Sequence, residues 1–295
     1  MVSSTTLAVI FDFDDTLVPD STSEFLKAHG IDPEHFWLTE VKALVDDGYD
    51  PTLAYLKRIF DNSGDGKPLG QLTNKALSDF GSTLDSKFFH GIPQVFEDLR
   101  DIVSKFRDMK VEFYIVSGGL ESIIRGSQIV NDQFDGVYGC QLAGDTPDGP
   151  LRYIKRAITF TEKTRYVFEI NKGIPAADVL KTPYLVNRSK PHPERRIRFP
   201  DMIYVGDGLT DIPCFSLVMG GAGDPEGGGL AFAVFDPSKD RSAKQALQEY
   251  LIPRRVVGAH APDYTKEREM GALLRASVAG RCSTIKIKEE LAGRT

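Results

Sequence analysis

The sequence predicts an α/β fold, in which helices on both faces cover a parallel β-sheet in a three-layer sandwich. Short apolar, β-branched stretches alternate with longer segments whose apolar residues recur at helical spacing. Polar clusters directly follow three of the apolar stretches, as expected where parallel strands end at one edge of a sheet. Between the first two expected strands lies a long segment with helical patterns only, which indicates an inserted helical module.

The first half of the chain supplies two of the expected strands. Residues 6–11 are continuously apolar and end in DFDDT, which is typical of a buried strand followed by a turn. Residues 21–89 show helical spacing interrupted by turn signals. A helix with one apolar face is expected from Pro93 to Phe106, followed by a strand over 111–116 that stops at SGG, and then by a helix over ESIIRGSQIVND.

The second half continues the alternation. Residues 137–160 are expected to form short strands around the turn GDTPDG, and residues 161–173 a helix that ends at Gly173. Strands are expected at 202–205, ending in GDGLTD, and at 230–235. A helical pattern at SAKQALQEYL follows, and the rest of this tail has no clear assignment.

Composition excludes several classes of protein. The chain has 295 residues, of which 41% are hydrophobic and 26% charged, and its net charge of -6 argues against a nucleic-acid surface. No apolar run is long enough for a membrane span, and the N-terminus does not resemble a signal peptide. Three scattered cysteines (Cys140, Cys214 and Cys282) indicate free thiols in a reducing compartment, so we expect a cytoplasmic protein.

Four acids follow the expected strands and predict a metal site: Asp12, Asp14, Asp207 and Asp211. Carboxylates that lie together repel one another unless a cation is present. Mg²⁺ prefers a few carboxylates together with water and phosphate oxygens. The alternative interpretation is that DFDDT is only a turn rich in aspartate.

The spacing of the first two acids suggests distinct roles. Phe13 separates Asp12 from Asp14 and would point the other way in an extended chain. Asp12 could attack a phosphorus atom, while Asp14 protonates the leaving oxygen and later activates water. Ser117 and the amides of Gly118 and Gly119 could donate to phosphate oxygens.

A lysine is needed to balance this charge, and two candidates occur. Lys163 lies at the expected start of a helix, where a cation is unfavourable unless it serves an anion that the helix end also attracts. Lys172 lies at the other end of the same helix, where the helix dipole explains it without a functional role. Lys163 is therefore the preferred candidate.

In this order, DFDDT, the serine of VSGG, the lysine and GDGLTD resemble the four motifs of the haloacid dehalogenase superfamily, most closely its phosphoserine-phosphatase-like branch. The resemblance implies a Rossmann-like α/β core over residues 1–18 and 90–295, with a helical cap over 19–89. It implies the following roles: Asp12 as nucleophile and metal ligand, Asp14 as general acid/base with its carbonyl on the metal, Asp207 as metal contact, Asp211 as supporting acid, and Thr16, Ser117, Gly118 and Lys163 around the phosphate.

Two positions depart from the pattern of phosphoserine phosphatases. Ser21 stands where a glutamate reads the substrate amine, and Thr210 replaces an asparagine of the last motif. We therefore expect a Mg²⁺-dependent phosphatase acting on a small phosphorylated metabolite, without naming serine phosphate. A phosphotransferase or phosphomutase using the same intermediate, and a catalytically weak metabolite-binding protein, are the alternatives. The sequence sets neither the substrate nor the oligomeric state.

Overall fold

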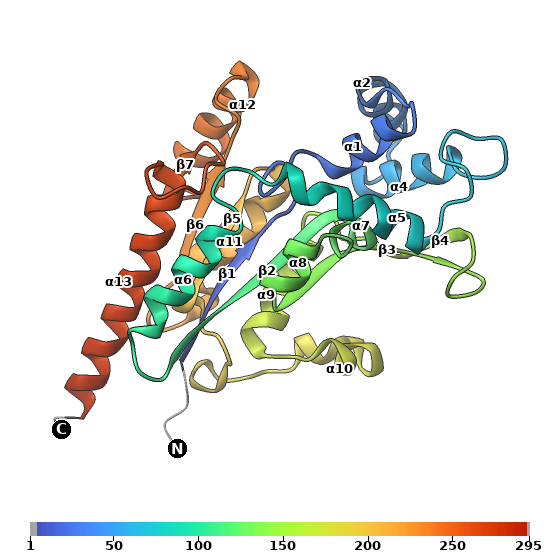
Figure 1. The fold of residues 1–295 in the computed structure, drawn as a ribbon. Helices are drawn as coiled ribbons and strands as arrows, with labels where there is room; N and C mark the ends of the chain where they lie inside the picture. Colours follow the sequence, from blue (N-terminus) through green and yellow to red (C-terminus); the bar gives the residue numbers. More distant parts are fainter. Residues whose placement is uncertain (1–4, 294–295) are drawn as a thin grey trace.

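A computed structural model describes residues 5–293 and contains a seven-stranded sheet in the order β4-β3-β2-β1-β5-β6-β7 (Figure 1). Neighbouring strands pair in parallel, except that β3 and β4 form an antiparallel pair. The strands are β1 (Thr5–Phe11), β2 (Met109–Leu120), β3 (Gly136–Gly144), β4 (Leu151–Arg156), β5 (Met202–Gly206), β6 (Leu230–Val234) and β7 (Gly258–His260). The predicted α/β fold with a parallel sheet is confirmed.

Helices cover both faces of this sheet: α6 packs beside α13 on one face, and α9 beside α11 on the other (Figure 1). The α-helices are α1 (Ser21–Ala28), α2 (Pro33–His35), α3 (Lys42–Asp46), α4 (Pro51–Asp61), α5 (Asn74–Gly81), α6 (Gln94–Ser104), α7 (Glu121–Ile124), α8 (Gln128–Gln133), α9 (Glu162–Lys172), α10 (Ala176–Lys181), α11 (Ile212–Gly220), α12 (Asp240–Gln245) and α13 (Glu269–Ala292). Short 3₁₀ and π turns complete the helical structure: η1 (Phe36–Val41), η2 (Ser82–Lys87), η3 (Pro183–Asn187), η4 (His192–Glu194), η5 (Phe199–Asp201), η6 (Leu209–Asp211), η7 (Gly221–Gly223) and η8 (Ala246–Leu251).

The central strand β1 anchors the molecule because every residue from Leu7 to Phe11 is buried. The Phe11 ring makes edge contacts with Phe96 of α6 and with Tyr264, at centroid distances of 5.9 and 6.2 Å. Such packing holds the end of β1 in one position. The first polar side chain after the strand, Asp12, is therefore presented from a rigid support.

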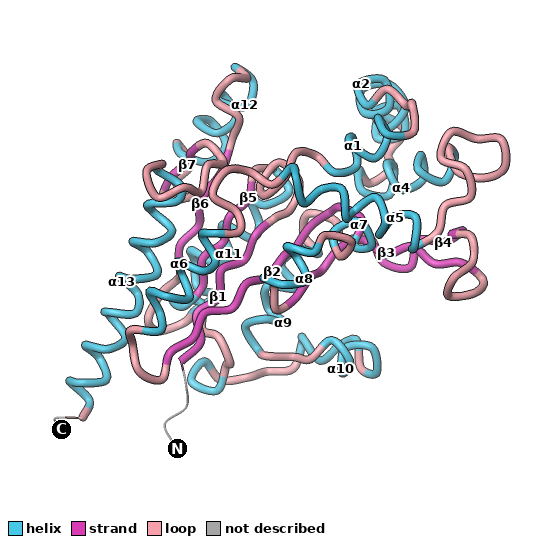
Figure 2. The backbone as a smooth tube through the Cα atoms, viewed as in Figure 1, coloured by secondary structure: helices cyan, strands magenta, loops and turns pink. Residues whose placement is uncertain are grey.

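The residues between β1 and α6 form a helical segment that contains α1 to α5 and no β-strand (Figure 2). This segment packs against the core where α5 meets α7. Gly81 and Gly126 allow that approach: a Cβ atom on Gly81 would lie 2.0 Å from the Ile123 carbonyl oxygen, and one on Gly126 would lie 2.1 Å from the Ser78 carbonyl oxygen. The two helices thus meet backbone to backbone.

The structure differs from the sequence-based expectation in three elements. Strand β2 does not stop before SGG but continues to Leu120, with an irregular register between Val116 and Leu120. The helix expected over 121–132 is two helices, because Ser127 caps a new helix with its Oγ, which accepts from the Val130 amide at 3.1 Å. Strand β7 and helix α13 lie in the tail that had no assignment.

Within residues 5–293, none of the helices combines the length and the apolar character needed to cross a lipid bilayer. The long helix α13 instead buries a narrow strip of about one residue per turn: Met270, Leu274, Val278, Cys282 and Ile285.

Candidate active site

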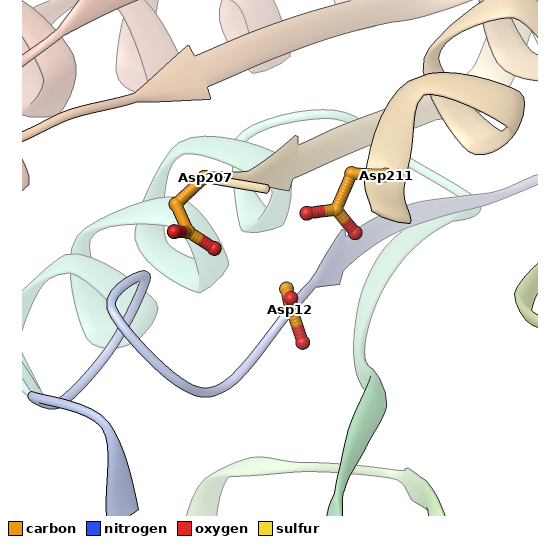
Figure 3. A group of neighbouring side chains, drawn as sticks. All are labelled: Asp12, Asp207 and Asp211. Atoms are coloured by element: carbon orange, nitrogen blue, oxygen red, sulfur yellow. The ribbon is translucent and has the colours of Figure 1, made fainter. Parts of the chain in front are cut away.

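Three carboxylates meet at the carboxyl edge of the sheet. Asp12 follows β1, Asp207 follows β5, and Asp211 ends the turn η6. The Asp12 amide donates to the Val205 carbonyl oxygen at 2.8 Å, which keeps the ends of the two strands in register. One carboxylate oxygen of each aspartate lies within 4.8 Å of the others, and Figure 3 shows the three side chains grouped in this way.

Lys163 lies inside this group. Its side chain is 1% exposed, and its Nζ donates to Asp12 Oδ2 and to Asp211 Oδ1, both at 2.8 Å. Although burial opposes a charged amine, the Asp12 and Asp211 carboxylates raise the pKa of Lys163, so the ammonium form is retained. Lys172, at the other end of α9, donates to the carbonyl oxygens of Val186 and Arg188 instead. The structure therefore brings Lys163, and not Lys172, to Asp12.

One cation does not neutralise three carboxylates. Burial raises the pKa of Asp12 to about 6, with Lys163 opposing the shift and Asp211 adding to it. Burial and the charges of Asp12 and Asp211 raise the pKa of Asp207 well above its usual value. Among the residues that the structure describes, none donates a hydrogen bond to the Asp207 carboxylate. The group has the excess negative charge and the free oxygens that suit a hard cation.

Three protein donors bond the Asp211 carboxylate, in contrast to that of Asp207. Its Oδ1 accepts from Lys163 and from the Tyr204 hydroxyl at 2.8 Å, and its Oδ2 accepts from the Gly208 amide at 3.0 Å. The Asp211 side chain is fully buried. These bonds hold Asp211 in place, and through it the ammonium group of Lys163.

The Asp14 side chain lies outside the three-carboxylate group. Its Oδ1 accepts from the Ser21 amide at 2.7 Å, at the start of α1. A Cβ atom on Gly119 would lie 2.5 Å from Asp14 Oδ2, so a larger residue at that position of β2 would displace the Asp14 carboxylate. Burial first, and then the charge of Asp20, raise the pKa of Asp14 well above its usual value. Asp14 therefore keeps a proton at a higher pH than an ordinary aspartate does.

The expected phosphate-binding residues occupy the same edge at the end of β2. Ser117 is buried, and its Oγ accepts from the Gly119 amide at 2.9 Å. The Gly118 carbonyl oxygen accepts from the Tyr55 hydroxyl at 2.6 Å and from Cys140 Sγ at 3.1 Å. Tyr55 belongs to α4, so the helical segment contacts the core directly at this strand end.

Thr16 is fully buried after β1, and its hydroxyl has no hydrogen-bond partner in the described part of the chain. Its carbonyl oxygen accepts from the Tyr264 hydroxyl at 2.7 Å. Thr16 thus helps to fix the loop that carries Asp14, through a main-chain contact from the C-terminal region.

Three tyrosines that support the site, Tyr204, Tyr250 and Tyr264, were not predicted from the sequence. Tyr204 bonds Asp211, and Tyr250 donates to the main-chain oxygen of Asp207 at 2.7 Å. A signal existed for Tyr204, because a hydroxyl within the buried strand MIYV needs a partner. Tyr250 and Tyr264 come from the tail and have no comparable sequence signal.

A cavity of about 410 Å³ opens beside this site, with Asp15, Phe89, Asp207 and Lys239 among its lining residues. Its volume is in the range of small-molecule sites. The carboxyl edge of the sheet thus combines buried acids, a buried lysine and adjacent open space.

No family model matches the sequence. A relative from Borreliella burgdorferi, an uncharacterized protein, is 29% identical over 235 residues, which cover 72% of this chain and 78% of the relative. It supports common ancestry over most of the chain, but its name describes no activity.

Solved structures with a similar fold include a HAD family hydrolase from Salmonella enterica serovar Typhi, with a TM-score of 0.53 and 14% identity, covering 93% of this chain and 72% of that one. A phosphoserine phosphatase, captured as an analogue of its phospho-aspartyl intermediate, has a TM-score of 0.50 and 14% identity over 92% of this chain and 99% of that one. A probable phosphoserine phosphatase from Vibrio cholerae has a TM-score of 0.52 and 12% identity, covering 97% and 67%. At this level of identity the likeness concerns the fold alone, which this chain shares with these structures of the haloacid dehalogenase (HAD) type.

Proposed function

We propose that this protein is a Mg²⁺-dependent phosphatase that hydrolyses a small phosphate monoester through an aspartyl-phosphate on Asp12. The observation that carries the proposal is the contact of buried Lys163 with Asp12 in a group of three carboxylates at the sheet edge. The HAD fold, shared with phosphoserine phosphatases, agrees with it.

The residues present fit a magnesium ion. Asp12 and Asp207 would hold it, together with the main-chain carbonyl of Asp14, as the resemblance to the family implies. The Asp207 carboxylate, which has raised pKa and no described hydrogen-bond donor, is the strongest support. When bound, Mg²⁺ would neutralise negative charge on the phosphate oxygens. Because three protein donors already bond the Asp211 carboxylate, we place it as the residue that positions Lys163.

The first half of the reaction transfers the phosphoryl group to the protein. A carboxylate oxygen of Asp12 attacks the phosphorus, and the ester P–O bond breaks. The protonated Asp14 carboxyl group gives its proton to the leaving oxygen, which departs as an alcohol. The raised pKa of Asp14 suits this role, because the proton must be present when the bond breaks.

The second half returns the protein to its starting state. Asp14, now ionised, takes a proton from a water molecule whose oxygen attacks the phosphorus. The bond between phosphorus and Asp12 breaks, and inorganic phosphate leaves. Ser117, the Gly118 backbone and Lys163 hold the phosphoryl oxygens, since the ammonium group has a third hydrogen beyond those used on Asp12 and Asp211.

We propose that residues 19–89 act as a cap on the core formed by residues 1–18 and 90–295. Two hydrogen bonds at the strand end support this role: Ser21 N–H to Asp14, and Tyr55 hydroxyl to the Gly118 carbonyl. A cap in this place would exclude bulk water from the reacting groups. Three buried free cysteines are consistent with a cytoplasmic location.

The test is phosphate release from a panel of phosphate monoesters, measured with Mg²⁺, with chelator, and with Asp12→Asn beside the native chain. We expect metal-dependent release that Asp12→Asn abolishes, while Asp101→Asn, an exposed acid on α6, leaves it unchanged. Full activity of Asp12→Asn would overturn the proposal.

Adding alcohol acceptors separates hydrolysis from phosphotransfer, because a transferase would form a new ester from the same intermediate.

A further inference from the structure

A second cavity, of about 450 Å³, lies toward the amino ends of β2 and β3, away from Asp12. Its lining includes Tyr114, Tyr138, Glu169, Gly173, Pro175 and Arg196. This volume suits a small organic molecule. Helix α9 connects the two places, because it begins next to Lys163 and ends at this cavity.

Glu169 is the unusual residue in this wall. Its side chain is 2% exposed, and one carboxylate oxygen accepts from Arg165 Nε at 2.9 Å. No described residue donates to its second oxygen, Oε2. Burial raises the pKa of Glu169, although Arg165 opposes the shift. Oε2 is not among the fully buried atoms that lack a partner, so this oxygen remains accessible and can accept a hydrogen bond from a ligand.

Tyr138 provides a second open polar group beside Glu169. Its ring lies against Tyr166, with centroids 4.8 Å apart, and no residue of the described chain bonds its hydroxyl. Burial and the charge of Glu169 raise the pKa of Tyr138 to about 12, which reflects how near the carboxylate lies to the phenol. An acceptor, an acid and an aromatic face therefore border the same space.

The other charged groups of the wall already have partners. Glu112 accepts from the two terminal guanidinium nitrogens of Arg196 and from the Tyr114 hydroxyl. Arg125 pairs with Glu121 and donates to a main-chain oxygen of β3. These groups enclose the cavity, and Glu169 has only a share of one cation, because Arg165 pairs with both Glu162 and Glu169.

The Asp135 carboxylate also lines the cavity and accepts from the Phe113 amide at 2.8 Å. It adds negative charge to the wall. The chemistry of the cavity thus favours a ligand that is positively charged and donates hydrogen bonds.

We propose that this cavity binds a small organic cation with a primary ammonium group, which donates to Glu169 Oε2 and to the Tyr138 hydroxyl oxygen. The ammonium has three hydrogens for these acceptors, and an aromatic face beside a cation adds attraction. The carbon chain of the ligand packs against Ile170 and Ile174, which also line the space. This site is separate from the proposed phosphatase reaction and does not depend on it.

The test is calorimetric titration of the full-length protein with n-butylammonium chloride, with Mg²⁺ present to occupy the acids around Asp12. n-Butanol, which has the same chain without the charge, serves as the matched ligand. We expect saturable binding at one site, and affinity at least about tenfold weaker for n-butanol, because its hydroxyl group has no charge and a single donor hydrogen.

Variants locate the binding. Glu169→Gln keeps the hydrogen bond to Arg165 and removes the charge, so it should weaken binding about tenfold or more. Glu162→Gln, which alters the other carboxylate partner of Arg165 outside the cavity, should bind as the native protein does. Should Glu169→Gln fail to fold, as judged by circular dichroism, Tyr138→Phe replaces it and should bind several-fold more weakly. Absence of saturable binding, or equal affinity in the native protein and the cavity variant, overturns the proposal.

Discussion

At the scale of single residues, a chain of hydrogen bonds that ends at Asp12 holds the candidate site in place. Tyr204 donates to Asp211, Asp211 accepts from Lys163, and Lys163 donates to Asp12. All four side chains are buried. Buried charges of this kind are costly unless every member has its partner, so each hydroxyl or amine fixes the next group along.

Tyr204→Phe is predicted to keep the fold and to lower kcat by roughly tenfold, because Asp211 loses one of the donors that position Lys163. Since the variant leaves the substrate pocket untouched, KM should change little. Steady-state kinetics with circular dichroism checks this.

Tyr166→Phe is the matched control for that variant, since its buried hydroxyl has no partner in the described chain. It should retain native kcat. A Tyr204→Phe protein as active as this control would show that the hydroxyl of Tyr204 does not position the site.

At the scale of elements, sequence patterns predicted the strands and helices whose residues are uniformly or periodically buried. They did not predict the elements whose ends or breaks depend on contacts with distant parts of the chain. Strands β1 and β5 and helix α9 are continuous or periodic in the sequence, and they form as predicted. The break between α7 and α8 instead serves the approach of α5, which needs Gly126 beside Ser78. Helix α13 buries only about one residue per turn, a weaker pattern than that of α6.

Gly81→Ala is predicted to destabilise the protein by roughly 1–3 kcal/mol, because the added methyl group overlaps the main chain of α7. Gly220→Ala is the control, since a Cβ atom there meets nothing within 4 Å and its φ of -75° is ordinary. Chemical denaturation measures both. Equal stability of the two variants would contradict the close packing of α5 on α7.

The pair of Glu112 and Arg196 ties the start of β2 to the segment before β5, and it gives a prediction about acid stability. Although burial opposes ionisation, hydrogen bonds from Arg196, Lys110 and Tyr114 lower the pKa of Glu112 to about 2. A lowered pKa means that the stabilisation is fully present above the usual value of 4.5 and is lost as pH falls toward about 2.

Glu112→Gln should therefore be less stable than the native protein at pH 7, by roughly 1–3 kcal/mol. The difference should shrink as the pH falls from about 4.5 toward about 2. Urea denaturation of both proteins across this range measures it. A difference in stability that does not change with pH would show that the partners of Glu112 do not lower its pKa.

At the scale of the whole molecule, the sequence predicted four acids at the strand ends, and the fold brings the carboxylates of three of them together. Asp12 and Asp207 are far apart in the chain, and only the pairing of β1 with β5 brings them together. The choice of Lys163 over Lys172 follows from the direction of α9 across the sheet. The supporting tyrosines could not be predicted, because Tyr250 and Tyr264 reach the site from a tail without a recognisable motif.

Magnesium is predicted to stabilise the whole chain. Asp12 and Asp207 repel each other in the absence of a cation, so binding should relieve that repulsion and raise the unfolding temperature. At saturating metal we expect an increase of about 5 °C, from roughly 2.7 kcal/mol of binding linkage in a chain of this size. Differential scanning calorimetry with Mg²⁺ or chelator, at equal ionic strength, checks this.

Asp207→Asn should lose most of that increase, because it removes a proposed ligand without disturbing Lys163 or Asp211. If the native chain and Asp207→Asn gain the same stability from Mg²⁺, the metal binds elsewhere.

The most direct test of the central claim is to find the phosphoryl group on Asp12. The protein would be mixed with p-nitrophenyl phosphate and Mg²⁺, quenched rapidly in acid and digested, and the peptides read by mass spectrometry. Asp14→Asn should accumulate the intermediate, because this leaving group departs without a proton donor while hydrolysis still needs the base. If Asp12 is the nucleophile, the peptide that carries it gains the mass of one phosphoryl group. Nitrophenol release with no phosphoryl on that residue, or with the phosphoryl on another residue, would contradict it.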